Sequence, residues 1–301
     1  MEDDKPIAAV IQEERLQNFA TRKALYKKIN KQLGKPLVAY VTSFTYPVMI
    51  DNKDADMLEA HLQKLKLDDG FVLLISSPGG DGLTAERIIN ICRAYSKSGD
   101  FITIVPGKAK SAATMICLGS SKIMMSKTSE LGPIDPQFLE RGPNGESRVY
   151  SVYNIVKSYK KIFDKAEKTQ GKIEPYLQAL SRYDSWNIEE CLSQLELSQD
   201  IGVKALKTGM LRDDSEDEIA NKIKRFLIPD ETKVHARPIY YDDVKSCDLI
   251  VELVPVDTPL WKNIYELYMR LEGYVSNNGI AKCIESEKYS FVQTYQRNEA
   301  Q

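Results

Sequence analysis

Alternating apolar runs and amphipathic stretches in the middle of the chain predict a β-α-β unit. Val72 to Ile75 is a continuous apolar run, which is typical of a strand buried on both faces. Leu83 to Tyr95 carries apolar residues at helical spacing, and Phe101 to Val105 is a second strand-like run. The crossover that joins two such parallel strands is right-handed in nearly all proteins. We therefore expect an α/β fold whose ligand site lies beyond the carboxyl ends of its strands.

The same patterning divides the chain into three parts. Residues 1–35 contain a charged amphipathic helix, and residues 36–228 hold the predicted α/β domain. A proline-bounded stretch follows, and residues 239–301 are expected to form a small α+β extension rich in tyrosine. Within this extension, Leu249 to Val254 predicts a strand and Trp261 to Tyr274 predicts a helix. We expect the extension to cover the core or to contact another subunit.

Two turns follow the predicted strands and carry the candidate chemistry. Ser76-Ser77-Pro78-Gly79-Gly80 ends the first strand, and Gly107 to Thr114 follows the second. This order places Ser111 at the start of a helix, where backbone N–H groups and the positive end of the helix dipole are available. Serine is also a common N-cap and Pro-Gly-Gly a common turn. Their shared edge of the sheet nevertheless indicates a nucleophilic serine beside an oxyanion hole.

In combination these segments resemble the Clp-fold serine peptidases, although no single one of them is specific. The resemblance rests on Ser76 to Ala85, the helix after it, and the pattern Gly-x-x-x-Ser-Ala-Ala that ends at Ala113. Ser129 to Gln137, Ser-Glu-Leu-Gly-Pro-Ile-Asp-Pro-Gln, is most similar to one branch, the SDH family or serine dehydrogenase proteinases. The similarity covers roughly Leu37 to Met210. It implies a ClpP/crotonase-like fold of repeated β-β-α spiral units and a serine peptidase that works through an acyl-enzyme.

The resemblance also implies roles for individual residues. Ser111 would be the nucleophile, and the backbone N–H groups of Gly80 and Ala112 would form the oxyanion hole. In many relatives the glycine segment pairs with the substrate peptide as an added β-strand. The substrate-binding residues implied in this way are Gly79, Asp81 and Gly82.

A serine nucleophile needs a base, and the chain contains only two histidines. His61 falls on the apolar face of a predicted helix and is expected to be a packed core residue. His235 lies in the charged, proline-bounded stretch, and no histidine occurs at Ile134 to Gln137, where the Clp proteolytic subunit carries its base. A Ser-His-Asp triad is therefore not expected. The other solution known in this fold is a Ser-Lys dyad, as in signal peptide peptidase A.

The predicted helix from Val149 to Lys168 carries the candidate lysines. The pattern around Lys157 most resembles the surroundings of a dyad lysine, and Lys160 is the runner-up, because helical periodicity does not decide between them. A lysine base must be neutral, so burial would have to lower its pKa from about 10.4. The alternative is that all these lysines form a solvated helix face. Lys110 is expected to meet substrate or a neighbouring acid, Asp135 to serve a turn, and Thr114 to bond its own helix backbone.

Composition narrows the partners and the compartment. A net charge of −2 gives no basic surface for nucleic acid. The five cysteines are scattered without metal-ligand spacing, so we expect reduced thiols, no metal and no cofactor. Met1 to Lys5 does not begin a signal peptide, and no apolar run approaches the roughly 20 residues of a membrane span. A cytoplasmic protein is expected.

Taken together, the residues and the resemblance predict an ATP-independent serine peptidase acting on peptides or unfolded proteins. Relatives assemble into rings, so the resemblance also implies a homo-oligomer. Two other classes remain open. A crotonase-like acyl-CoA enzyme shares the fold but relies on the oxyanion hole and on glutamates, and a catalytically silent oligomeric adaptor would retain the fold alone.

Overall fold

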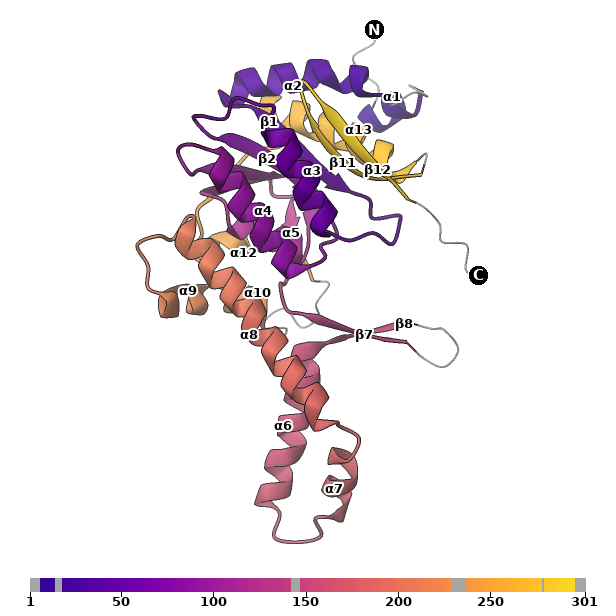
Figure 1. The fold of residues 1–301 in the computed structure, drawn as a ribbon, viewed down its shortest axis with the longest axis vertical. Helices are drawn as coiled ribbons and strands as arrows, with labels where there is room; N and C mark the ends of the chain where they lie inside the picture. Colours follow the sequence, from indigo (N-terminus) through magenta and orange to yellow (C-terminus); the bar gives the residue numbers. More distant parts are fainter. Residues whose placement is uncertain (1–5, 14–17, 142–146, 229–236, 278, 296–301) are drawn as a thin grey trace.

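A seven-stranded sheet forms the centre of the molecule (Figure 1). The computed structural model of this chain describes residues 6–13, 18–141, 147–228, 237–277 and 279–295. Strands β10, β5, β3, β2 and β1 run parallel in that order, and β11 and β12 continue the sheet antiparallel beyond β1. Their bounds are β1 Leu37–Thr42, β2 Phe71–Ser76, β3 Phe101–Val105, β5 Lys122–Met125, β10 Val251–Leu253, β11 Ile280–Ser286 and β12 Ser290–Thr294.

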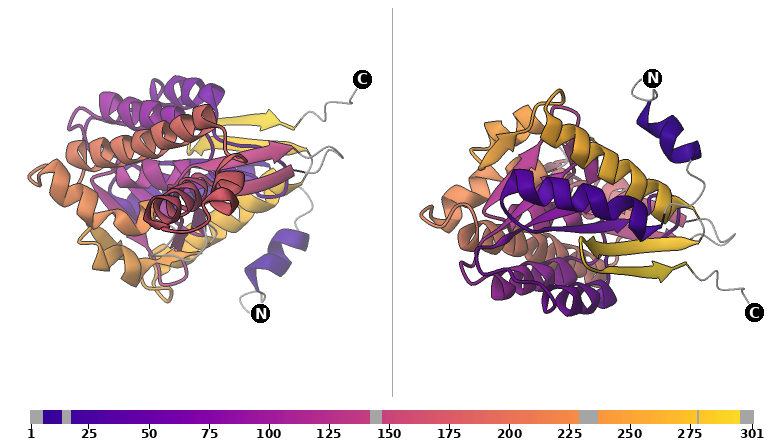
Figure 2. Two further views of the ribbon diagram at one scale, coloured as in Figure 1. Left: turned by 90° about the horizontal axis from the view of Figure 1, so that it is seen from below. Right: turned by 90° about the horizontal axis from the view of Figure 1, so that it is seen from above.

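Two helical layers bury the sheet on both faces (Figure 2). Side chains of β1 alternate between them: Val38 and Tyr40 pack into one apolar cluster, and Leu37, Ala39 and Val41 pack into the other. This alternation between two dry faces explains why the central strands are continuous apolar runs, and it confirms the expected α/β fold. The first layer contains α3 Asn52–Leu62, α4 Gly82–Tyr95 and α5 Ala112–Leu118, and the second contains α2 Phe19–Leu33 and α13 Pro259–Ser276.

Residues of the predicted C-terminal extension belong to the central sheet. Strand β10 pairs with β5 at one edge, and β11 pairs with β1 on the opposite side. Helix α13 packs against α2 and β11 in the second layer. The extension and the α/β domain therefore share one sheet. We call this sheet and its two helical layers the body.

A helical arm and a β-hairpin project from the body (Figure 1). The arm consists of α6 Val152–Lys168, α7 Glu174–Leu180 and the first half of α8 Ser185–Thr208. The hairpin pairs β7 Gln137–Arg141 with β8 Ser147–Ser151. Its last residue, Ser151, is the N-cap of α6, so Val149 lies in a strand and the predicted helix begins three residues later than expected.

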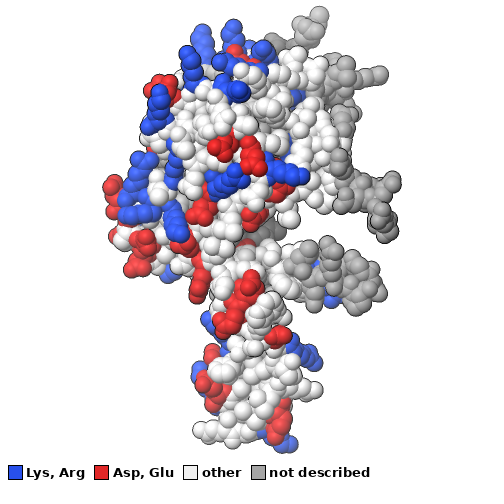
Figure 3. Space-filling model, viewed as in Figure 1, with Lys and Arg blue, Asp and Glu red and all other residues white. Residues whose placement is uncertain are grey.

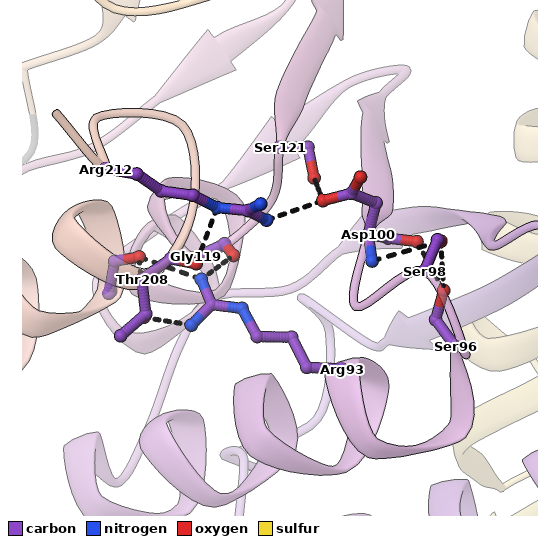
Figure 4. Close-up of polar contacts among 9 residues, drawn as sticks. Arg93, Ser96, Ser98, Asp100, Gly119, Ser121, Thr208 and Arg212 are labelled. Carbon is purple, nitrogen blue, oxygen red and sulfur yellow. Dashed lines mark hydrogen bonds and ion pairs between the residues drawn. The ribbon is translucent and has the colours of Figure 1, made fainter.

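Helix α8 is tied to the body at its C-terminal end (Figure 4). Arg93 of α4 donates hydrogen bonds to the carbonyls of Gly119 at 2.5 Å and Ala205 at 2.9 Å, and also to the Thr208 hydroxyl. Close by, Arg212 forms an ion pair of 2.6 Å with Asp100. These charge-assisted bonds fix one end of α8, while its other end extends into the arm.

The remaining elements are short. A small three-stranded sheet is ordered β4-β6-β9, and its strand β4 is bridged to Ser77, the residue after β2. The predicted N-terminal helix is observed as two helices, with residues 14–17 between them outside the described part of the chain. These elements are β4 Lys108–Ala109, β6 Glu130–Leu131, β9 Ile239–Tyr240, α1 Ile7–Glu13, α9 Glu216–Lys222, α10 Lys224–Leu227 and α12 Tyr241–Ser246.

Candidate active site

Ser111 has an unusual backbone conformation at the start of α5. Its φ is 50° and its ψ is −120°, in a region that residues other than glycine rarely adopt. Its hydroxyl does not cap the helix, although serine usually does so at this position. The turn is closely packed, because a Cβ added to Gly79 would lie 2.6 Å from the Ser111 Cβ. Such strain is typical of functional sites, where surrounding structure enforces it.

The glycine segment next to Ser111 is held by the backbone of Ile50. The Ile50 N–H donates to the Gly79 carbonyl at 2.8 Å, and the Asp81 N–H donates to the Ile50 carbonyl at 3.0 Å. A Cβ at Gly80, whose φ is 157°, would lie 2.3 Å from the Ile50 nitrogen, so this close approach requires glycine. Within the described ranges, neither the Gly80 N–H nor the Ala112 N–H donates a hydrogen bond. Two available donors beside a serine are what an oxyanion hole requires.

Ser111 opens into a cavity of about 640 Å³. Its Ser111 side is formed by residues 78–82, which include the predicted substrate-binding residues Gly79, Asp81 and Gly82. Residues of α8 and of the β7–β8 hairpin also line the cavity. Most of the lining is apolar, so the cavity suits an apolar side chain next to a reacting carbonyl. The apolar side chains are Met49, Met115, Ile134, Pro136, Val149, Leu197 and Ile201.

The candidate lysines line a different hollow. Lys157 and Lys160 border a space of about 530 Å³ between α6 and α8, together with Leu192 and Leu195. The Lys157 Nζ lies 5.8 Å from the centre of the Tyr153 ring. Among the described residues that line the Ser111 cavity there is no lysine of α6. The structure thus brings Ser111, Gly80 and Ala112 together but places both lysines in the neighbouring hollow.

Lys110 is occupied by partners of its own. Its Nζ donates to the Leu131 carbonyl at 3.1 Å and forms an ion pair of 3.3 Å with the Glu130 carboxylate. Burial lowers the pKa of Lys110, and Glu130 opposes that shift. The expectation that Lys110 meets a neighbouring acid is confirmed.

His61 is a core residue, as expected. Its side chain is fully buried, and its ring lies edge-on to Phe291, with centroids 5.5 Å apart. Neither ring nitrogen has a hydrogen-bond partner among the described residues, and burial lowers the pKa of His61 to about 4. His235 lies outside the described residues.

Two polar residues near the site have structural partners. The Thr114 hydroxyl donates to the Ala109 carbonyl at 2.8 Å and accepts from the Gly132 N–H at 3.1 Å. The prediction that Thr114 bonds its own helix was wrong, because Ala109 belongs to β4 and Gly132 to the loop after β6. Buried Asp135 accepts from the Ser151 hydroxyl at 3.0 Å and thereby joins the two ends of the hairpin that lines the cavity.

Sequence reasoning missed the part of the cavity lining that α8 provides. Gln194, Leu197 and Ser198 lie on α8 more than 80 residues after Ser111, and their pattern is that of an ordinary amphipathic helix. The role of Ile50 was also missed, since only the fold places it against Gly80.

Among the described residues, no group of three or more histidine, cysteine or acidic side chains is arranged to hold a metal. Nor does the described part of the chain contain a helix that is long and apolar enough to cross a membrane.

Comparison with known proteins gives two similar sequences, one similar solved structure and a matching family model. Two uncharacterized proteins of Methanocaldococcus jannaschii are similar: MJ0137 is 26% identical over 77% of this chain and 72% of its own length, and MJ1495 is 23% identical over 80% and 73%. A solved structure of a membrane-bound stomatin-specific protease, a lysine-to-alanine mutant with a substrate peptide, covers 74% of this chain and 93% of its own. That match has 19% identity and a TM-score of 0.30. Residues 17–169 match the sequence model of the ClpP-like SDH-type serine proteinases. The chain therefore belongs to the family of ClpP-like SDH-type serine proteinases.

Proposed function

We propose that this protein is a serine peptidase in which Ser111 is the nucleophile. Family membership supports the class of reaction, and the backbone of Ser111 carries the assignment of the residue. Ser111 has a φ of 50°, which is rare for a residue other than glycine, its hydroxyl does not cap α5, and the residue lines the cavity. The unpaired N–H groups of Gly80 and Ala112 support the same assignment.

In the proposed reaction, Ser111 Oγ attacks the carbonyl carbon of a peptide bond and loses its proton to a base. The N–H groups of Gly80 and Ala112 stabilise the negative oxygen that develops. The C–N bond then breaks, the amine leaves with the proton, and a water molecule hydrolyses the ester on Ser111. These steps consume no nucleotide, and ATP independence is part of the proposal. The substrates we propose are peptides and unfolded proteins, because an extended backbone can add to a segment such as residues 79–82 as a β-strand.

We propose Lys157 as the base, with Lys160 as the alternative. Lys157 lies on α6 beside Val156, which is buried against α8. Leu195 borders the lysine hollow while Gln194 borders the Ser111 cavity, so the two spaces are neighbours along α8. A Ser111–Lys157 dyad therefore requires the arm to shift against the body. We also propose that several copies of the chain assemble. Contacts between copies are one means of fixing the position of the arm.

A fluorophosphonate probe tests the proposal directly, because it reacts covalently with an activated serine. We expect the wild type to be labelled and to degrade a denatured protein without ATP. Ser111→Ala should lose labelling and at least about a thousandfold of turnover while keeping its fold. Turnover that is unchanged in Ser111→Ala would exclude the nucleophile. An unlabelled wild type that binds acyl-CoA tightly would favour the crotonase-like alternative.

Matched lysine variants test the base. Lys157→Ala should lower turnover by roughly a hundredfold or more, in the range of a lost general base. Lys161→Ala is the control, since it removes a lysine from the same hollow one helical turn away. Loss of labelling in Lys160→Ala but not in Lys157→Ala would assign the base to Lys160.

A further inference from the structure

A buried lysine from the C-terminal strands is connected to the glycine segment of the candidate site through the start of α3. The Lys282 side chain on β11 is 1% exposed. Its Nζ donates to the Asp54 carboxylate at 2.7 Å and to the Asp51 carboxylate at 2.9 Å. Both acids belong to the start of α3, more than 220 residues earlier in the chain. Lys282 also lies well outside residues 17–169, which match the family.

The two carboxylates continue this contact into the backbone of α3. The Asp51 N–H donates to the Asp54 Oδ2 at 2.8 Å, and the Lys53 N–H donates to the Asp51 Oδ1 at 2.9 Å. These bonds form a reciprocal capping box at the first turn of α3. Lys282 binds the Oδ2 atom of each acid, so one ammonium group holds both side chains of the cap.

The residue before this capping box contacts the glycine segment. Ile50 precedes Asp51, and its N–H and carbonyl bond Gly79 and Asp81 on either side of Gly80. The two segments are in close contact, because a Cβ added to Gly80 would lie 2.3 Å from the Ile50 nitrogen. A shift of the α3 cap would therefore move the Gly80 N–H. Donors must stay about 3 Å from the developing oxyanion to act on it.

Electrostatics make Lys282 hard to replace in this role. Asp54 is fully buried, and burial raises the pKa of its carboxyl group while Lys282 opposes that shift. Without the ammonium group, two carboxylates would face each other with no positive partner, one of them in a dry environment. Breaking a buried pair in this way is strongly unfavourable, so the first turn of α3 would rearrange.

We infer that Lys282 is a positioning residue of the active site, which sets the Gly80 donor through Asp51, Asp54 and Ile50. This inference rests on the proposed peptidase function for its catalytic consequence. It gives the C-terminal strands a task in the reaction, although none of their residues lines the Ser111 cavity.

The test compares Lys282→Met with Lys288→Met, which removes an exposed lysine from the turn of the same hairpin. Active sites are counted with the fluorophosphonate probe, and turnover is expressed per labelled site. We expect kcat of Lys282→Met to fall tenfold to about a hundredfold, with KM within about twofold, because a displaced donor acts on the transition state. Lys288→Met should match the wild type. An unchanged kcat per site in Lys282→Met would overturn the inference.

A rescue separates positioning from general loss of stability. Asp54→Asn added to Lys282→Met removes the stranded charge and keeps an amide oxygen to accept from the Asp51 N–H. We expect this double variant to recover at least threefold of the lost kcat, and no recovery would count against the mechanism. If Lys282→Met does not fold, Asp51→Asn decides instead. It keeps the N-cap but weakens the contact with Lys282, and kcat should fall about threefold with KM unchanged, whereas an unchanged kcat would overturn the inference.

Hydrogen exchange provides a readout that does not depend on activity. In the Ser111→Ala background, the Ile50 and Asp81 amides should exchange at least tenfold faster in Lys282→Met than in Lys288→Met. Equal rates would overturn the link between Lys282 and the glycine segment. If the wild type is neither labelled nor active, the proposed function fails, and the exchange rates still decide whether Lys282 sets this segment.

Discussion

The body and the arm differ in how much apolar surface they bury. In the body, the sheet carries a large cluster on each face, and its central strands are fully buried. In the arm, the apolar cluster has three fully packed members, Val152, Val156 and Cys191. Large apolar side chains of the arm face solvent, including Trp186 at 73% exposed. The proposed nucleophile therefore lies in the firmly packed part of the molecule and the proposed base in the loosely packed part.

Charged residues show the same contrast. The body contains the fully buried pair Arg22–Glu285 and the buried Lys282–Asp54 pair. Figure 3 shows charged side chains of both signs on the visible surface of the arm, among larger uncharged areas. Buried pairs fix geometry because either partner alone is strongly unfavourable, whereas exposed charges contribute little. In the proposed site, the oxyanion hole would therefore be preset, and the position of the base would depend on the arm.

Removing the charge of Glu285 should have the largest effect on stability. Arg22 Nη2 lies 2.6 Å from Glu285 Oε2, and both side chains are fully buried. Glu285→Gln removes the carboxylate that pairs with this buried guanidinium and should lower the free energy of unfolding by about 3–5 kcal/mol. Asp200→Asn is the control, because it breaks an exposed pair with Lys204 and should change stability by less than about 0.5 kcal/mol. Urea unfolding measures both, and equal values would remove the contrast between buried and exposed pairs.

A pair of leucine truncations compares the two regions directly. Leu73 is fully buried in β2, and Leu73→Ala should lower the free energy of unfolding by about 2–5 kcal/mol. Leu192 is half-buried in the arm, and Leu192→Ala should cost roughly 1 kcal/mol. Hydrogen exchange should show Leu192→Ala loosening the arm alone. A loss of protection throughout the body in Leu192→Ala would show that the arm and the body unfold as one unit.

The stability of the body should fall in mild acid because of His61. Burial holds the pKa of His61 at about 4, below its ordinary value of 6.5, so the unfolded chain takes up the proton first. The stabilisation is complete above pH 6.5 and is lost as the pH falls toward 4, up to about 3 kcal/mol. His61→Phe should flatten the unfolding free energy over this pH range. A variant with the same slope as the wild type would assign the acid sensitivity to other groups.

Trp186→Ala should have the smallest effect. This side chain is 73% exposed near the start of α8, so its loss should change the free energy of unfolding by no more than about 0.5 kcal/mol. Thermal melting at two protein concentrations measures the effect. A large, concentration-dependent loss would mean that another copy covers the arm in solution, and the arm would then be as well packed as the body.

Local patterns were sufficient to predict that Gly80 and Ser111 lie together. The strands β2 and β3 are apolar runs, and the turns that follow them carry Gly80 and Ser111, so their shared edge follows from a single β-α-β unit. The helix that begins at Val152 was predicted too early, because its N-cap, Ser151, was taken as part of the helix. Capping residues leave a weaker signal than apolar periodicity.

Contacts between distant segments could not be predicted in the same way. Lys282 and Asp54 are 228 residues apart, and neither lies in a motif that indicates the other. The contact of Ile50 with Gly80 depends on how the loop after β1 lies against the loop after β2. Similarly, the position of Lys157 relative to Ser111 depends on the direction in which the arm leaves the body, which helical periodicity does not determine.

The backbone conformation of Ser111 bears on which residue evolution would favour at this position. Its conformation suits glycine, so Ser111→Gly should relieve roughly 1–3 kcal/mol of strain and melt at a higher temperature than Ser111→Ala. Selection for thermal stability alone would favour glycine at this position, whereas selection for the proposed reaction would retain the serine. A related protein with glycine at this position would keep the fold but would lack the proposed nucleophile.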